Sequence, residues 1–325
     1  MKLLRRELLQ LAAGTAALAI VPHLSRAQAY PSRPVRIVVG LAPGGTNDIT
    51  ARLMGQWLSE RLGQQFVIEN RPGAGTNIAT EMVVRAPADG YTLLLVGAYT
   101  AINATLYEKL NFNFIRDIAP VASIARVPLV MVVNPSVPAK TVPEFIAFAK
   151  ANPGKISMAS AGNGSTPHVA GELFKMMAGI DIVHVPYRGN GPAITDLLGG
   201  QVQVLFAGAP ESIEHIRAGR LRPLAVTDTT RLEAPPDIPT VGEFVAGYRA
   251  SAWLGLGAPK NTPADIVDKL NKEINAGLAD PKIKTRVADM GGTVLTGSPR
   301  DFGQFIVDET EKWGKVIRAL NIKAE

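Results

Sequence analysis

The chain has 325 residues, of which 46% are hydrophobic and 19% charged, so it can bury a sizeable core, and this excludes a disordered protein and a mini-protein scaffold. Because it contains no cysteine, it can form no disulfide, no cysteine-ligated zinc or iron–sulfur site and no cysteine nucleophile. A length of this order is typical of about two domains.

The formal net charge of +6 depends strongly on the N-terminus. Residues 1–29 carry four basic side chains and one acid, with an apolar run at residues 8–24 and a small-residue Ala-Gln-Ala sequence at the end. This pattern predicts a secretory signal peptide, and the pair Arg5-Arg6 leaves both the general secretory and the twin-arginine routes open. Removing the segment leaves 30 basic against 27 acidic residues, and a net charge of +3 gives no electrostatic case for a nucleic-acid partner.

From residue 30 onward, short β-branched runs alternate with amphipathic stretches, as in a parallel α/β sheet. The first predicted strands are residues 35–39, 66–68 and 93–96. A helix should follow the turn at residues 43–45, and another the turn at residues 71–75. The side chains expected on the inner faces are Ile49, Leu53, Trp57 and Leu58 in the first helix, and Ile78, Met82 and Val83 in the second.

A similar rhythm restarts after residues 127–134, an extended segment that we expect to cross into a second lobe. Residues 224–227 resemble a crossing back. The elements expected between the crossings are a helix capped by Thr141, a strand at 156–159, a helix entered through residues 162–167, and strands at 182–185 and 202–206. Two more helices should begin at Thr262-Pro263 and Ser298-Pro299, each with an N-cap followed by proline.

Two α/β lobes joined by two crossings would enclose a cleft, and in open α/β sheets ligands bind beyond the carboxyl ends of the strands. We therefore expect three parts. Residues 1–29 form the signal peptide, residues 30–126 together with 229–325 form lobe one, and residues 127–228 form lobe two. The loops that follow strands are then the candidate binding residues.

Four post-strand loops combine glycine with Ser, Thr, Tyr or Asn: residues 44–48, 73–77, 97–100 and 162–166. Glycine lets the backbone approach a ligand, while hydroxyls and helix N-terminal N–H groups donate hydrogen bonds to an anion. The loops suit a carboxylate or a phosphate without a cationic cage. Each loop alone is more typical of ordinary helix caps and turns than of a binding site, and it is their recurrence on both sides of the predicted cleft that favours binding. Asp48 would repel an anion unless it orders the loop N–H groups or acts through water.

The sequence gives less support to a catalytic site or a metal site than to a binding site made of these loops. Ser165 and His168 could form a nucleophile–base pair, which keeps a secreted hydrolase as an alternative, but the G-x-S-x-G pattern is absent. The histidines show no metal-ligand spacing, and His184 alternates with apolar residues as a structural histidine does. Neither a complete G-x-G-x-x-G nor a Walker A sequence occurs, so we expect no metal and no cofactor.

Several short motifs then occur in a recognisable order. They are Tyr-Pro-Ser-Arg-Pro at 30–34, Pro-Gly-Gly-Thr-Asn-Asp at 43–48, Asn-Arg-Pro-Gly-Ala-Gly at 70–75, Ala-Asp-Gly-Tyr-Thr-Leu at 88–93, Val-Pro-Tyr-Arg-Gly at 185–189, and Ile-Pro-Thr at 238–240 with Glu243. Together they resemble the Bug family, the periplasmic substrate-binding proteins of tripartite tricarboxylate transporters, over essentially the whole mature chain. The resemblance implies a Venus-flytrap fold of two Rossmann-like lobes. It also implies that a small organic carboxylate is captured in the periplasm and delivered to membrane permease subunits, and we expect a monomer that is not an enzyme.

The loops and the resemblance together place the ligand between the lobes. The residues expected to bind it are Gly44, Gly45, Thr46, Asn47, Asp48, Tyr99 and Thr100 in lobe one and Ser160, Gly164, Ser165, Thr166, Tyr187, Arg188, Gly189 and Ala207 in lobe two. Family members that hold amino acids often have an Asp just after the strand that ends here at Phe206, where this chain has Ala207-Gly208-Ala209. That departure favours a carboxylate without an ammonium group. The alternatives are the Ser165/His168 hydrolase and an exported structural or sensory domain.

Overall fold

The computed structural model describes residues 30–229, 231 and 238–324. The predicted signal peptide at residues 1–29 lies outside these residues. All the elements described below belong to one unit, residues 33–325.

The first sheet region has the strand order β2-β1-β3-β9-β4, with the short β10 also paired to β4. The β1, β2 and β3 strands are mutually parallel, whereas β9 is antiparallel to both β3 and β4. Their bounds are β1 (Val35–Val39), β2 (Phe66–Asn70), β3 (Thr92–Gly97), β4 (Ile118–Val133), β9 (Ser251–Pro259) and β10 (Thr293–Val294). The strand predicted at residues 35–39 is confirmed, and its Val and Ile side chains are buried as the composition of a central parallel strand requires.

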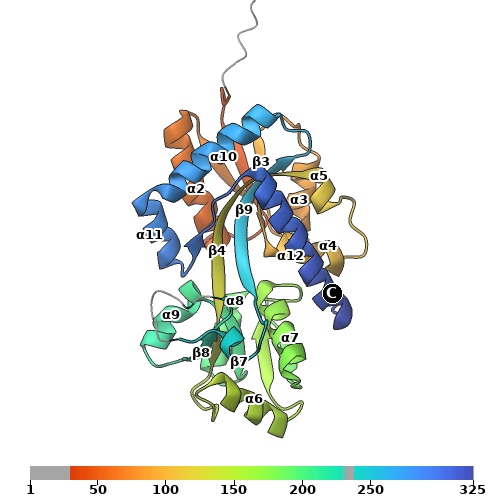
Figure 1. Cartoon of the computed structure of the whole chain (residues 1–325), viewed down its shortest axis with the longest axis vertical. Coiled ribbons are helices and arrows are strands. Elements are labelled where there is room, and N and C mark those ends of the chain that lie inside the picture. Colours follow the sequence, from red (N-terminus) through yellow and green to blue (C-terminus); the bar gives the residue numbers. More distant parts are fainter. Residues whose placement is uncertain (1–29, 230, 232–237, 325) are drawn as a thin grey trace, which may run out of the picture. The chain divides into compact units, whose positions relative to one another are not determined.

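The second sheet region starts from the same strand β4, whose residues 129–133 pair antiparallel with β7 and β8. Parallel pairing then continues from β7 to β5 and from β5 to β6. The bounds are β5 (Ser157–Ser160), β6 (Val183–Pro186), β7 (Val204–Gly208) and β8 (Arg222–Val226). The parallel sheet expected from the sequence is therefore a mixed one, because the long strands β4 and β9 run against their neighbours (Figure 1).

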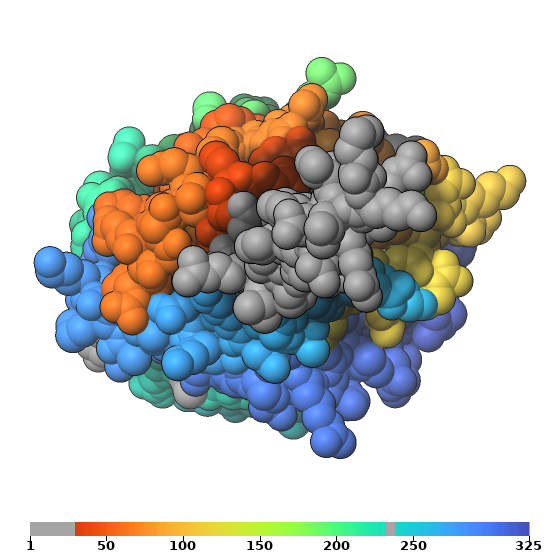
Figure 2. Space-filling model, turned by 90° about the horizontal axis from the view of Figure 1, so that it is seen from above, coloured from red at the N-terminus to blue at the C-terminus, as the bar shows by residue number. Residues whose placement is uncertain are grey.

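Helices connect and cover the strands. Their bounds are α2 (Thr46–Leu62), η2 (Ala74–Thr76), α3 (Asn77–Val84), α4 (Ala98–Leu106), α5 (Phe114–Asp117), α6 (Val142–Ala151), α7 (Thr166–Ala178), α8 (Asn190–Leu198), α9 (Ala209–Arg217), η3 (Val241–Glu243), α10 (Ala264–Ala279), α11 (Pro281–Asp289) and α12 (Pro299–Ala319). The caps predicted at Thr141 and Ser298 are confirmed, since each side chain accepts a backbone N–H of the first turn. Segments from the N-terminal third and from the C-terminal part share one face of the molecule in Figure 2.

Two predicted helix faces are partly wrong. Ile49 of α2 is 39% exposed and Ile78 of α3 is 53% exposed. In α2 the buried row is instead Ala51, Met54 and Leu58, spaced by three and four residues as one helix face requires. Leu58 was predicted on this face, but the face also includes the small residues Thr50, Ala51 and Gly55, which hydrophobicity alone does not identify.

The strand β4 carries the chain from one sheet region to the other without a break, which agrees with the extended segment predicted at 127–134. The crossing back to the first sheet region was predicted at residues 224–227, and the residues that follow this segment contact the second region. Thr240 bridges Val226, and the Tyr248 hydroxyl donates to the Ala170 carbonyl at 3.0 Å, so this part of the chain packs against the second region. The lobe boundaries stay a prediction, and we propose that the return crossing lies in β9, which begins at Ser251.

Gly255 of β9 tests how closely β4, β9 and α12 pack. A Cβ atom there would lie 2.2 Å from the Phe302 ring and 2.6 Å from the Ala122 carbonyl oxygen. We expect Gly255→Ala to lower the free energy of unfolding by about 2–3 kcal/mol, because the carbonyl cannot move aside without breaking the pairing. Denaturant unfolding measures the effect. Gly191→Ala is the control, since a Cβ there would have no neighbour within 4 Å; equal stabilities of the two variants would contradict the prediction.

Candidate functional site

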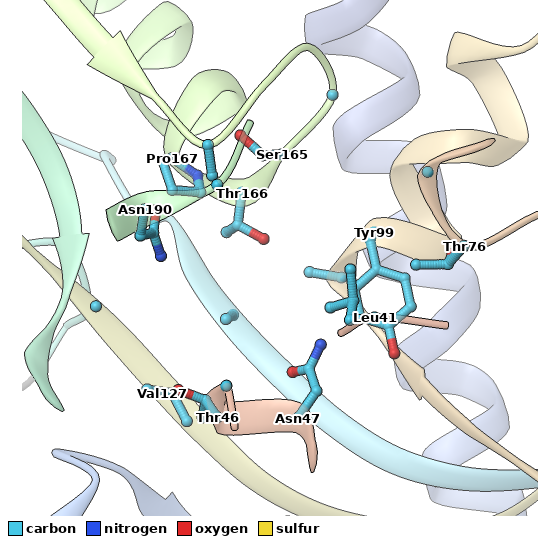
Figure 3. A pocket seen from close by; sticks show the side chains of 18 of the residues that line it. Leu41, Thr46, Asn47, Thr76, Tyr99, Val127, Ser165, Thr166, Pro167 and Asn190 are labelled. Atoms are coloured by element: carbon cyan, nitrogen blue, oxygen red, sulfur yellow. The ribbon is translucent and has the colours of Figure 1, made fainter. Parts of the chain in front are cut away.

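A cavity of about 600 Å³ lies where the two sheet regions meet on β4 and β9 (Figure 3). Residues of those strands, including Val127, Leu129 and Trp253, line it together with loops that follow strands of both regions. The predicted binding residues that line the cavity are Gly45, Thr46, Asn47, Tyr99, Gly164, Ser165, Thr166 and Gly189. The loops expected to converge from the two lobes therefore do so.

The loop after β1 presents the start of α2 to the cavity. Asp48 itself is 3% exposed and faces away from the lining, where its carboxylate accepts the Gly44 N–H at 2.9 Å and binds the Arg52 guanidinium at 2.9 Å. Burial alone would raise the pKa of Asp48, but the hydrogen bonds from Arg52 and Gly44 outweigh it and hold the pKa below its ordinary value. Asp48 thus orders the turn, while Thr46 and Asn47 face the cavity.

The loop after β5 presents the start of α7. The Ser165 hydroxyl accepts the backbone N–H of His168 at 3.4 Å, and the His168 Nδ1 accepts the backbone N–H of Gly164 at 3.0 Å. Ser165 and His168 are therefore both used to cap and close the loop, and their side chains do not form the nucleophile–base pair that the hydrolase alternative needs. The Thr166 side chain extends toward the middle of the cavity (Figure 3).

His168 and His184 pack together next to the loop after β5 and support it. The ring of His184 stacks on that of His168 at a centroid distance of 3.8 Å, and His184 Nε2 shares a hydrogen bond of 2.6 Å with the Ser160 hydroxyl. Burial, and for His168 also the neighbouring His184, lowers the pKa of His168 to about 3 and that of His184 to about 4. Both rings are thus neutral at ordinary pH. Ser160, predicted to bind ligand, lies outside the cavity lining and completes this support.

Tyr99 and Thr100 begin α4 beside the cavity. The Tyr99 ring lines the cavity, but its hydroxyl donates to the Leu95 carbonyl at 2.9 Å, and burial raises its pKa well above the ordinary value. The buried Thr100 hydroxyl donates to the Gly97 carbonyl and so closes the first turn of α4. Tyr99 therefore offers an aromatic surface, and Thr100 stays outside the lining.

The other predicted residues lie outside the cavity lining for identifiable reasons. The Tyr187 hydroxyl donates to the Asp196 carboxylate at 2.7 Å, and burial together with this contact raises its pKa to about 12. Arg188 is exposed, and Ala207 is fully buried where β7 pairs with β4. Gly44 donates its N–H to Asp48 next to the lining residue Gly45.

The cavity wall has a distinct electrostatic character. Among the residues that the structure describes, its lining contains no Lys, Arg or His side chain and one charged group, Glu211 of α9. The N-terminal turns of α2 and α7 open into it through Thr46, Asn47, Ser165 and Thr166. Backbone N–H groups at a helix start lack partners within the helix and favour negative charge. The two helix starts therefore favour negative charge in the cavity.

A family model described as a tripartite tricarboxylate transporter family receptor matches residues 50–322. The chain belongs to this family. The BugT protein of Bordetella pertussis is 38% identical over 302 residues, covering 91% of this chain and 92% of BugT. The predicted Bug-family membership and its two-lobe periplasmic-binding-protein fold are thus confirmed.

Solved structures extend the likeness of this receptor to ligand-bound proteins. Rpa4515 of R. palustris with adipate is 37% identical, has a TM-score of 0.83, and covers 90% of this chain and 99% of its own. MatC of Rhodopseudomonas palustris with bound malate is 31% identical, has a TM-score of 0.79, and covers 89% of this chain and 100% of its own. Both ligands are carboxylates.

Several residues that line the receptor's cavity were missed from the sequence. Thr76 lies in the 73–77 loop that the composition singled out, and the residue is buried. Its backbone φ of 83° lies in the left-handed region, which is unusual for a β-branched residue. Glu211 and Asn190 lie in the first turns of α9 and α8, just after the residues that were predicted to bind the ligand. Trp253 lies on β9, a strand that the pattern did not identify.

Within residues 30–229, 231 and 238–324, no helix has the length and apolar composition needed to cross a bilayer. The apolar run at residues 8–24 lies outside this part of the chain. In the same part, no three His, Asp or Glu side chains gather where they could share a metal ion.

The stacked histidines should make the receptor sensitive to acid. Below pH 6.5 the unfolded chain protonates both histidines while the folded state keeps them neutral, so stability is full above that pH and falls toward pH 4. Each histidine contributes a slope of about 1.4 kcal/mol per pH unit over this window. We expect His168→Asn, which keeps an acceptor for the Gly164 N–H, to remove one such slope from the unfolding free energy measured by urea titration between pH 4 and 6. His215→Asn on α9 is the control, and an unchanged slope in the His168 variant would refute the assignment.

Proposed function

We propose that this chain is a periplasmic receptor that captures a small organic carboxylate in the cavity and delivers it to the membrane permease subunits of a tripartite tricarboxylate transporter. The observation that carries the proposal is the meeting of two helix starts, those of α2 and α7, at one cavity. Their dipoles and the nearby hydroxyls suit a compact anion. The predicted signal peptide agrees with export to the periplasm.

The strength of this anion site comes from several small terms. A negative charge near one helix start gains roughly 0.3–1 kcal/mol, and a hydrogen bond to a charged group contributes about 1.5–3 kcal/mol. Micromolar affinity needs about 8 kcal/mol, so two helix starts must be joined by side-chain donors. Thr46, Asn47 and Thr166 are the lining side chains placed to supply them.

The ligand class is supported by the neighbours with bound adipate and malate. The cavity is large enough for molecules of that size, and its lining residues Leu41, Val127 and Trp253 offer an apolar wall for a carbon chain. We propose that the receptor acts as a monomer and without catalysis, and that the two lobes close on the ligand about the shared strands β4 and β9.

The exclusion of an ammonium group stays a prediction. It depends on Ala207-Gly208-Ala209 standing where an Asp could have met a cation. Glu211, which the sequence argument did not count, brings a carboxylate to the cavity from the first turn of α9. The proposed ligand is therefore a small organic carboxylate.

A thermal-shift screen of mono-, di- and tricarboxylates and aromatic acids at millimolar concentration tests the function. At least one acid should raise the melting temperature of the mature protein by mass action. For that acid, Thr166→Val should weaken binding about tenfold, because a hydroxyl donor to a charged group is lost while the side-chain shape is kept.

The matched control is Thr195→Val, which removes an exposed hydroxyl of α8 outside the lining. Failure of every acid in the screen would argue against the receptor function. Equal affinities of the Thr166 and Thr195 variants would instead show that Thr166 does not contact the ligand.

A further inference from the structure

Glu211 is placed unusually for a residue of an anion site. Among the described residues it is the one charged side chain of the cavity lining, and its Oε2 atom is shielded from solvent and has no hydrogen-bond partner. A carboxylate oxygen that loses water and gains no partner costs free energy, so a donor that reaches this carboxylate from the cavity would stabilise it. A ligand carboxylate placed beside it would add repulsion to that cost.

The Glu211 carboxylate lies where a side chain at position 208 would be, so it fits there because residue 208 is glycine. A Cβ atom at Gly208 would lie 2.3 Å from Glu211 Oε2 and 3.1 Å from its Cδ, although the φ of −59° at Gly208 suits any residue. A side chain at position 208 would therefore force the Glu211 carboxylate to move, and both residues line the cavity. The Glu211 carboxylate thus lies against the backbone at the end of β7 and the start of α9.

Asn190 supplies a second acceptor from the neighbouring helix start. It is the first residue of α8, its side chain reaches the cavity, and its Oδ1 atom is shielded and has no partner among the described residues (Figure 3). Helices α8 and α9 contact each other. The starts of α8 and α9 thus carry two side-chain oxygens that lack hydrogen-bond partners among the described residues.

We infer that Glu211 and Asn190 form an acceptor subsite that takes a hydrogen-bond donor, a hydroxyl or an ammonium group, borne by the carboxylate ligand. The subsite selects against plain acids that would place a methylene or a second carboxylate there, since either would leave Glu211 unpaired or repelled. This inference rests on the proposed carboxylate-receptor function. In the proposed complex Glu211 and Asn190 accept hydrogen bonds from the ligand, while Thr46, Asn47 and Thr166 donate to it.

Calorimetric titration of matched acids tests the inference. The probes are succinate, malate and aspartate, and in parallel glutarate, its hydroxy derivative and glutamate, so each series differs only in the donor. In at least one series the hydroxyl- or ammonium-bearing member should bind at least about tenfold more tightly than the plain acid. The better of the two identifies the donor.

Three variants connect that preference to the subsite. In Glu211→Leu the preference should vanish, and in Gly208→Ala it should fall, because the new methyl group displaces the carboxylate. Glu211→Gln separates the donors: a hydroxyl preference is largely retained, whereas an ammonium preference is lost with the charge. Glu214→Gln, an acid of the same helix whose side chain is 73% exposed, is the control and should match the wild type.

The outcomes that would overturn the inference differ from those that would overturn the receptor function. If plain acids bind as tightly as their donor-bearing partners in both series, the acceptor subsite is wrong and the receptor function stands. A donor preference that survives in Glu211→Leu also refutes the subsite. Should no acid bind at all, the receptor function itself fails. Melting temperatures without ligand show whether each variant is folded.

Discussion

The antiparallel pairing of β4 with β9 is the interaction on which the rest of the structure depends. The two strands pair over residues 118–128 and 251–259, and β4 then continues directly into the second sheet region. Residues of both strands line the cavity, so the element that joins the two regions also lies against the ligand space. Close packing makes this possible, since Gly255 leaves no room for a side chain beneath Phe302 of α12.

Helix α12 holds β9 at the cavity by a buried polar contact. The indole N–H of Trp253 donates to Glu309 at 3.2 Å, and the same carboxylate accepts the indole N–H of Trp313 at 3.0 Å and pairs with Lys312. A buried carboxylate needs such partners, because an unpaired one is costly. The Trp253 indole is thereby fixed between β9 and α12, far along the chain from the loops that supply the polar groups of the cavity.

Among the described residues, some polar side chains near the cavity are hydrogen-bonded within the protein, and others line the cavity without such a bond. The side chains of Asp48, Ser160, Thr100 and Tyr187 are engaged in hydrogen bonds within the protein and stabilise the surroundings of the cavity. Only a few lining side chains are left to meet a ligand directly, so in the proposed function Thr46, Asn47 and Thr166 act together with the backbone N–H groups of the helix starts. Such groups are held rigidly by the fold, and they need no reorganisation when a carboxylate arrives.

The sequence by itself determined the family, the strand–loop–helix rhythm and the loops that meet at the cavity, because glycine turns, N-caps and β-branched runs are local signals read within a few residues. It also singled out Thr46, Asn47 and Thr166, which line the cavity. Only the tertiary structure decided which neighbours face the ligand. Whether Asp48 or Glu211 reaches the cavity depends on partners distant in the chain and on the room beside Gly208, and no local pattern carries that information.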